Sequence, residues 1–178
     1  MDLFAENGEV NLHAARLILR SPGVADRQAI VDGFNDYAIA QWLSVVPHPY
    51  GLDDADWYTD HVAKGDVRAW MIHDVSGLVG GIGVGDELGY WLARSAWGKG
   101  YLTEAAQTVL AHVFADLATT QLIAGHFLQN TASGNVLRKL GFEPTHLRVR
   151  PCKARGHDMD SQEMRLTRDR WQSLSNPR

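Results

Sequence analysis

The spacing of apolar residues changes several times along this chain, and each change indicates a new element. Short runs rich in β-branched and aromatic residues predict strands, whereas apolar positions three and four residues apart predict helices. The strand-like runs are residues 16–20, 67–73, 78–84, 87–92, 121–127, 145–150 and 163–167. The helix-like segments are two short ones within 25–46, broken near Asn35, then 53–64, a long helix after Gly100 with an apolar face from Ala106 to Leu117, and 131–140.

Turn and cap residues support these boundaries. Asp53 or Asp54 can cap the start of the helix that follows, and Gly65 and Gly141 can end helices in the left-handed conformation. Residues 74–77 lie between two strand-like runs and favour a hairpin.

The order of these elements predicts the α/β class in its mixed α+β form. A chain of 178 residues fits a single domain over 1–178, with its core over about 14–170. We expect a central mixed, mostly antiparallel sheet of about six to seven strands, flanked by helices. No repeat, low-complexity segment or linker divides the chain.

Composition disfavours several classes of function. The net charge is −4 and the basic residues are scattered, so nucleic acid is not an expected partner. Cys152 is the only cysteine, which excludes a disulfide framework and a multi-cysteine metal site, and we expect no bound metal. Residues 1–10 do not resemble a signal peptide, and no apolar run approaches the roughly 18 residues of a membrane span. We expect a cytoplasmic protein without membrane contact.

Gly98-Lys99-Gly100 is the most informative segment, because it joins a predicted strand to a predicted helix. Closely spaced glycines at a helix start let backbone N–H groups converge on a phosphate, and Arg94 and Lys99 add positive charge. A Walker loop is excluded because Gly100 stands where Ser or Thr would hold magnesium, and a dinucleotide fingerprint because Thr103 replaces its third glycine. A plain strand-to-helix turn is the structural alternative.

Several segments together resemble the GNAT acetyltransferases, specifically their RimJ/RimL-like branch. They are Tyr90 through Ala105, Ala14 through Arg20, Pro47-His48-Pro49-Tyr50, Asn130 through Ser133, and Lys139-Leu140-Gly141-Phe142. The resemblance covers about residues 14–170. Ser95 stands where the superfamily pattern has Gln or Arg, and Ala14 where the opening motif usually has Thr.

The resemblance implies acetyl-CoA as cosubstrate and assigns residues to it. The pyrophosphate and pantetheine would contact Trp91, Leu92, Ala93, Arg94, Trp97, Gly98, Lys99, Gly100, Tyr101 and Leu102. Asn130 would bond the pantetheine arm, Ser133 would protonate the departing thiol, and Arg138 could reach a CoA phosphate. Tyr50 would line the acceptor site. Asn130 and Ser133 also suit a helix cap and a polar residue of the first helical turn.

The general base has two candidates. Glu87 opens the strand that leads to the loop, and His126 lies on a neighbouring predicted strand. Carboxylates and histidines are the side chains that most often act as general bases. Each also has a structural interpretation, as a solvated carboxylate and as a packed histidine.

These observations predict an acetyl-CoA-dependent N-acetyltransferase that acts by direct transfer to a primary amine. The acceptor could be a protein N-terminus or a small-molecule amine, and the protein a monomer or homodimer. The alternative is a catalytically idle sensor or regulatory module that binds acyl-CoA without turnover.

Overall fold

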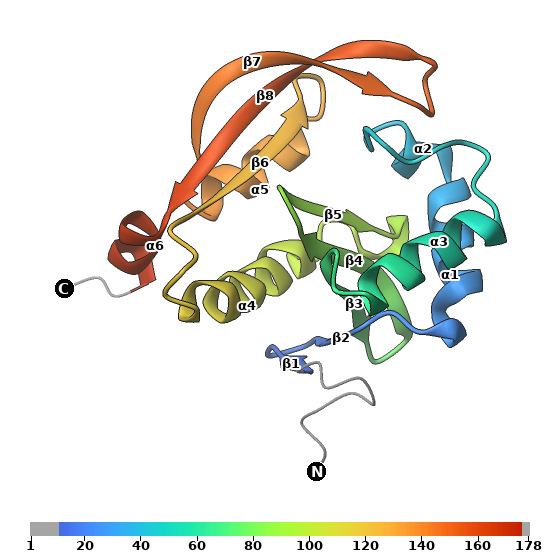
Figure 1. Cartoon of the computed structure of the whole chain (residues 1–178), viewed down its shortest axis with the longest axis horizontal. Helices are drawn as coiled ribbons and strands as arrows, with labels where there is room; N and C mark the ends of the chain where they lie inside the picture. Colours follow the sequence, from blue (N-terminus) through green and yellow to red (C-terminus); the bar gives the residue numbers. More distant parts are fainter. Residues whose placement is uncertain (1–10, 176–178) are drawn as a thin grey trace.

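The computed structural model describes residues 11–175. Within this range, five strands form an antiparallel sheet in the order β1-β2-β3-β4-β5 (Figure 1). They are β1 (Leu12–His13), β2 (Ile18–Arg20), β3 (Arg68–Asp74), β4 (Gly77–Val84) and β5 (Leu88–Leu92). The hairpin predicted around residues 74–77 is confirmed as β3–β4.

A second, three-stranded antiparallel sheet has the order β6-β8-β7. Its strands are β6 (Gln121–Phe127), β7 (Glu143–Cys152) and β8 (His157–Thr167). The long β7–β8 hairpin arches over the rest of the molecule in Figure 1. The mixed class and the mostly antiparallel pairing are confirmed, but among residues 11–175 the strands divide into two sheets, because no ladder joins β5 to β6.

Helices cover the sheets on both sides. The first group comprises the short 3-10 turn η1 (Val24–Asp26), α1 (Arg27–Asn35), α2 (Tyr37–Ala40) and α3 (Leu52–Ala63). The second comprises η2 (Arg94–Ala96), α4 (Tyr101–Ala115), α5 (Thr131–Lys139) and α6 (Arg168–Ser175). No helix in the part of the chain described is long and apolar enough to cross a membrane.

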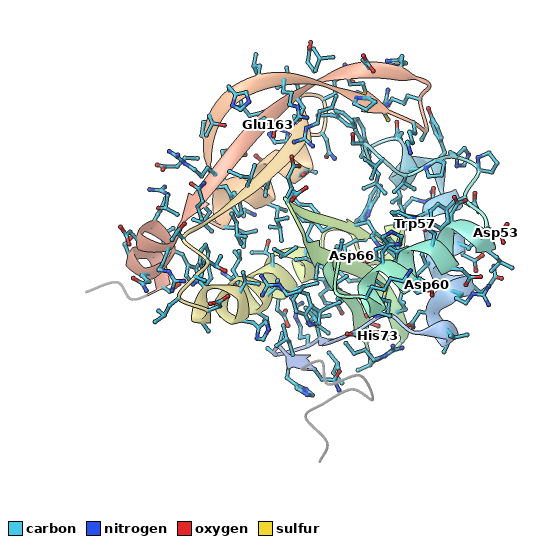
Figure 2. The ribbon with its side chains drawn as sticks, in the orientation of Figure 1. Asp53, Trp57, Asp60, Asp66, His73 and Glu163 are labelled. Atoms are coloured by element: carbon cyan, nitrogen blue, oxygen red, sulfur yellow. The ribbon has the colours of Figure 1, made fainter. Side chains whose placement is uncertain are left out.

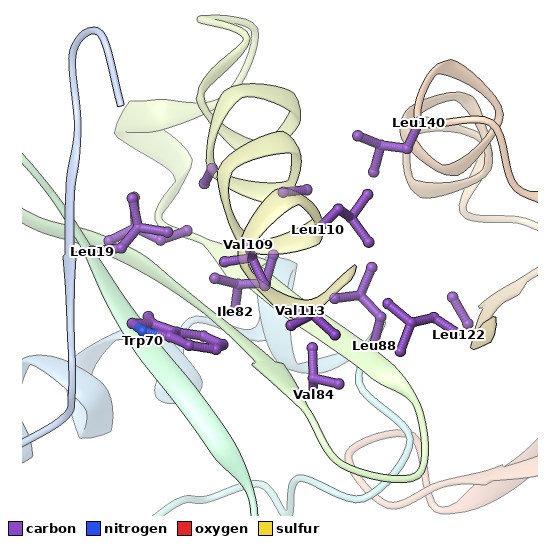
Figure 3. Packing of buried hydrophobic residues seen from close by; sticks show 14 of the residues in the cluster. Leu19, Trp70, Ile82, Val84, Leu88, Val109, Leu110, Val113, Leu122 and Leu140 are labelled. Atoms are coloured by element: carbon purple, nitrogen blue, oxygen red, sulfur yellow. The ribbon is translucent and has the colours of Figure 1, made fainter. Parts of the chain in front are cut away.

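Alternate residues of the first sheet face two separate cores. Trp70 and Ile72 pack toward α4, whereas Met71 between them packs with the N-terminal helices, as the two-residue period of a strand requires. The larger core places the α4 side chains Val109, Leu110 and Val113, all fully buried, against the sheet (Figure 3). Truncation of a side chain buried this deeply costs about 2–5 kcal/mol, so this face holds α4 in place at the end of β5.

Some boundaries differ from the sequence-based expectations. β1 and α6 were not expected, and β7 and β8 are longer than predicted. The N-cap of α3 is Gly51, and the Asp54 carboxylate accepts from the Gly51 N–H at 2.8 Å, so neither Asp53 nor Asp54 is the cap. Leu117 lies beyond α4 and is 83% exposed, so it is not part of the apolar face.

Candidate active site

The glycine loop joins β5 to α4. Gly98 and Gly100 have φ of 74° and 78°, in the left-handed region that glycine adopts without a steric cost. Gly100 is the N-cap of α4, and a Cβ atom at Gly98 would meet nothing within 4 Å. The first N–H groups of an α-helix have no partner within the helix, and the helix dipole places positive charge there. The loop therefore presents unblocked donors that fit a phosphate.

Arg16, two residues before β2, forms hydrogen bonds with this loop and with the first turn of α4. Its Nη1 donates to the Lys99 carbonyl at 3.0 Å, while its Nε and its backbone N–H donate to the Glu104 carboxylate at 2.8 and 2.7 Å. The guanidinium carbon also lies 4.7 Å from the centre of the Tyr101 ring. Arg16 thus ties the loop and the first turn of α4 to the start of the chain's first sheet.

Arg94 and Lys99 differ in what they offer to a phosphate. Arg94 Nε donates to Asp36 Oδ2 at 2.5 Å, so the guanidinium is directed toward α2. Lys99 is exposed, with its Nζ 5.6 Å from the Tyr101 ring centre. Contact of either side chain with a phosphate stays a prediction: Arg94 has its Nε bonded to Asp36 and its side chain 64% exposed, and Lys99 is the second cation of the loop.

The backbone of β5 has one occupied edge and one edge that faces away from β4. The Ala93 N–H donates to the Val79 carbonyl at 2.9 Å, so this group is not free for a ligand. Because strand N–H groups alternate in direction, those of Tyr90 and Leu92 point to the opposite edge. The Trp97 indole N–H donates to the Leu92 carbonyl at 2.9 Å and fixes the turn that follows the strand.

Ser133 lies in the first turn of α5 and contacts a side chain from β5. Asn130 is the N-cap, as predicted, and its Oδ1 accepts from the Ser133 N–H at 3.2 Å. The Tyr90 hydroxyl oxygen lies 2.8 Å from Ser133 Oγ. Burial raises the pKa of Tyr90 to about 12. Arg138 is exposed at the far end of this helix, where it donates to Asn135 Oδ1 at 2.8 Å.

His126 packs against the same turn of α5. A Cβ atom at Gly134 would lie 2.8 Å from His126 Nε2, so only glycine leaves room for the ring. His126 Nδ1 lies 2.9 Å from the Phe127 carbonyl, which can only accept, and this contact assigns the ring hydrogen to Nδ1. Nε2 is buried without a hydrogen-bond partner among the described residues. The ring therefore has a buried nitrogen without a hydrogen-bond partner in the described part of the chain, packed against Gly134 of the helix.

Glu87 immediately precedes β5 and belongs to a cluster of charges. Its Oε1 accepts from Arg150 Nη2 at 2.5 Å, and Arg148 Nη1 lies 3.9 Å away. The same Arg150 guanidinium is bonded to Glu163, whose side chain is 3% exposed. Figure 2 shows Glu163 where β6 and β8 run side by side. The two base candidates thus differ, because Glu87 is partly exposed and ion-paired, whereas His126 is buried.

Two of the predicted contact residues are buried in the smaller core. The Trp91 ring lies 5.0 Å from that of Phe34, so its side chain faces away from the α4 side of the sheet. Tyr50 is 7% exposed, and its hydroxyl donates to the Asp54 carbonyl at 3.0 Å. Contact between Tyr50 and an acceptor stays a prediction, and it would involve a side chain that packs in this core.

Sequence reasoning did not assign side-chain roles to Arg16, Tyr90, Arg150 or Glu163. The Tyr90–Ser133 contact joins residues 43 positions apart, and the Arg150–Glu87 contact residues 63 positions apart. The alternation of β5 could have placed Tyr90 opposite Trp91, on the face toward α4 and α5. No local signal identifies the other three.

Comparison with known proteins gives the family of this site. The chain matches the family model described as an acetyltransferase (GNAT) domain over residues 16–143. It is therefore a member of the GNAT acetyltransferase family. The putative ribosomal N-acetyltransferase YdaF of Bacillus subtilis (strain 168) is 26% identical in an alignment 148 positions long that covers 75% of this chain and 80% of that protein.

Solved structures share the fold. One is the spermidine N-acetyltransferase from Vibrio cholerae in complex with CoA and spermine, with a TM-score of 0.77, 18% identity, and coverage of 89% of this chain and 99% of that one. Another is the RimL ribosomal L7/L12 alpha-N-protein acetyltransferase in complex with coenzyme A, with a TM-score of 0.76, 15% identity, and coverage of 88% and 97%. These similarities agree with the RimJ/RimL-like branch of the family.

Proposed function

We propose that this protein transfers the acetyl group of acetyl-CoA directly to a primary amine. The names of its relatives supply two kinds of acceptor, a small polyamine and the N-terminus of a ribosomal protein. The acceptor of this chain is a primary amine of one of these two classes. A cytoplasmic location, and a monomeric or homodimeric state, remain predictions from the sequence.

The glycine loop would hold the pyrophosphate of the cosubstrate. Gly98 and Gly100 leave space for phosphate oxygens, and the N–H groups at the start of α4, from Tyr101 and Leu102, donate to them. Lys99 adds positive charge nearby. Asn130 would bond the pantetheine arm through the donors of its amide, because its Oδ1 already accepts from Ser133.

The contact between Tyr90 and Ser133 is the single observation that carries the catalytic proposal. Because burial raises the pKa of Tyr90 to about 12, its hydroxyl stays protonated at neutral pH and can donate to Ser133 Oγ. The hydrogen of Ser133 Oγ is then free to point toward the leaving sulfur. Ser133 protonates that sulfur as the carbon–sulfur bond breaks, and Tyr90 keeps the serine hydroxyl in the productive orientation.

Glu87 would accept the proton of the attacking amine. Its Oε1 is held by Arg150, while among the described residues its Oε2 has no hydrogen-bond partner. The edge donors of Tyr90 and Leu92 on β5 would stabilise negative charge on the carbonyl oxygen under attack. His126 is kept as the second candidate, since its enclosed Nε2 could act only through water or after movement of α5.

The state of the two base candidates favours one alternative, an acyl-CoA-binding sensor without turnover. In that case the ion pair of Glu87 and the enclosure of His126 would be purely structural. A screen of primary amines with acetyl-CoA, followed by free-thiol release and by mass spectrometry of the amine, separates the two. Amine-dependent thiol release with an acetylated product supports the enzyme, and acetyl-CoA binding without release from any amine supports the sensor.

A further inference from the structure

Arg150 connects two carboxylates that come from different sheets. Its Nη2 donates to Glu87 Oε1 at 2.5 Å and to Glu163 Oε2 at 2.5 Å, and its Nε donates to Glu163 Oε1 at 2.7 Å. Arg150 and Glu163 lie on β7 and β8 of the second sheet, whereas Glu87 adjoins β5 of the first. The guanidinium therefore bridges the place where the two sheets separate.

The hydrogens of Arg150 are divided unequally between its partners. Nη2 carries two hydrogens, one for each carboxylate, and Nε gives its only hydrogen to Glu163. Glu163 thus receives a two-point contact and Glu87 a single one. Burial opposes ionisation of Glu163, but the Arg150 guanidinium lowers the pKa of this carboxyl below its ordinary value, so Glu163 stays charged.

Neighbouring residues leave room for the Arg150–Glu163 pair and hold it in place. Gly125 on β6 lies beneath it, and a Cβ atom there would come within 3.1 Å of both Arg150 Nη2 and Glu163 Oε1. The Ser161 hydroxyl donates to the His126 carbonyl at 3.1 Å and lies 3.4 Å from Glu163 Oε1. Glu163 is therefore anchored by residues of its own sheet.

We infer that Arg150 is a positioning residue for Glu87 and that Glu163 is the counter-ion that makes this positioning compatible with base catalysis. The inference rests on the proposed function. Arg150 fixes Oε1 and turns Oε2 outward as the proton acceptor. Because Glu163 takes two of its three hydrogen bonds and balances its charge, Glu87 is oriented without being neutralised.

The reaction that this arrangement serves is balanced. The amine nitrogen bonds to the acetyl carbon, one amine proton moves to Glu87 Oε2, the carbon–sulfur bond breaks, and the sulfur takes a proton from Ser133. Glu87 then releases its proton to water, and Ser133 regains a proton from water, so that both groups return to their starting state. Without Glu163, the whole charge of Arg150 would act on Glu87 and weaken it as a base.

The bridge can be tested without an acceptor, by NMR of the Arg150 side chain at neutral pH. The Nε–H signal, assigned by its disappearance in Arg150→Lys, should shift in both Glu163→Gln and Glu87→Gln. Glu143→Gln is the matched control, since Glu143 is also ion-paired to an arginine, Arg170, at 3.1 Å, and should leave the signal in place. An unchanged Arg150 signal in Glu87→Gln would show that the bridge does not exist in solution and would overturn the inference.

The catalytic role is tested by a double-mutant cycle, with spermidine and a short peptide beginning with serine as probe acceptors. We expect Glu87→Gln to lower the single-turnover rate about 100-fold and Glu163→Gln about 10-fold. In the double variant, Glu163→Gln should add less than about twofold, because its effect passes through Glu87. Glu143→Gln should keep the wild-type rate. Arg150→Lys keeps the positive charge but loses the guanidinium group that contacts both carboxylates, and it should retain less than half of the wild-type rate.

Independent effects that multiply in the double variant would overturn the positioning role, because a purely structural Glu163 would lower the rate equally in both backgrounds. Melting temperatures of all variants identify any that fail to fold, and Arg150→Lys then replaces Glu163→Gln in the cycle. A bridge seen by NMR together with no turnover on any amine would contradict the proposed function, and with it the role of Arg150, while leaving the bridge intact.

Discussion

Ser133 lies on the thiol side of the proposed reaction and Glu87 on the amine side, and the two residues are held in different ways. Ser133 is held by neutral groups, the Asn130 amide and the Tyr90 hydroxyl. Glu87 is held by a charged cluster in which Arg150 also contacts a buried glutamate, Glu163. The thiol side therefore has no formal charge to balance, whereas the amine side holds carboxylates and guanidinium groups at hydrogen-bond distance.

This difference follows from what each side has to do. A serine hydroxyl that protonates a leaving sulfur needs orientation, which a neutral hydrogen bond supplies at a net contribution of about 0.5–1.5 kcal/mol. A carboxylate that takes a proton must remain charged and oriented in a partly buried place, which requires a fixed cation. That cation in turn needs its own counter-ion, because an uncompensated buried charge costs about 3–5 kcal/mol.

Both sides depend on the glycine loop, so its disruption should have the largest effect. Gly100→Glu places a side chain and a negative charge at the N-cap of α4, where phosphate is expected, and should lower acetyl-CoA affinity more than 100-fold in calorimetry. Gly156→Glu is the matched control, because Gly156 also has positive φ and an exposed position but lies in the β7–β8 turn. Equal affinities for the two variants would remove the loop from the cosubstrate site.

Loss of the hydroxyl on the thiol side should lower the rate and leave binding unchanged. Ser133→Ala should reduce the single-turnover rate about 100-fold, the low end of the range for acid catalysis, since water can partly replace the hydroxyl. Acetyl-CoA affinity should stay within about twofold, because the proton is used only as the sulfur leaves. Thr131→Ala, in the same helical turn and exposed, is the control. A normal rate for Ser133→Ala would exclude Ser133 from the chemistry.

Loss of the Tyr90 hydroxyl, the neutral partner of Ser133, should lower the rate less than loss of the Ser133 hydroxyl itself. Tyr90→Phe removes only the hydroxyl that orients Ser133 and should lower the single-turnover rate about 3- to 10-fold, without a change in acetyl-CoA affinity. When Ser133→Ala is already present, Tyr90→Phe should have no further effect on the rate. Tyr37→Phe on α2, 47% exposed, controls for a general loss of tyrosine hydroxyl. An equal effect of Tyr90→Phe with and without Ser133 would contradict the orienting role.

The amine side, with its charged groups, should also differ from the thiol side in how its contribution to stability depends on pH. Glu163 has a lowered pKa in the folded state, so its stabilisation is complete above its ordinary value of 4.5 and is lost as the pH falls through the folded-state pKa. Arg150 keeps Glu87 as a partner in Glu163→Gln, so this variant should lower the free energy of unfolding by about 1–3 kcal/mol at pH 7, with a smaller difference below pH 4.5. Urea unfolding measures this, and the loss in Ser133→Ala should not vary with pH. A pH-independent loss in Glu163→Gln would show that its charge does not stabilise the fold.

The sequence predicted the residues of the thiol side better than those of the amine side, for a physical reason. Asn130 and Ser133 lie in one helical turn, where cap chemistry and motif spacing are local, and the structure confirms Asn130 as the N-cap. β6 also has the predicted bounds. Glu163 and Arg150 meet only because β7 pairs with β8 along its length, and nothing in either local sequence indicates that pairing.

Arg94 and Tyr50 illustrate the same limit. Each has a residue type and position that suit a ligand contact, but the local sequence does not indicate that Arg94 pairs with Asp36 or that Tyr50 packs in the smaller core. Local sequence indicates what a side chain can do. Tertiary contacts decide which of its possible partners it meets.

The most direct test of the central claim is the amine-dependent release of free thiol from acetyl-CoA, measured together with the mass of the amine. The panel should contain spermidine and a peptide with an N-terminal serine, and Gly100→Glu should serve as the inactive reference. We predict at least one amine for which thiol and acetylated amine form in equal amounts with the wild-type protein and not with Gly100→Glu. Acetyl-CoA that binds the wild-type protein but releases no thiol with any amine would contradict the account.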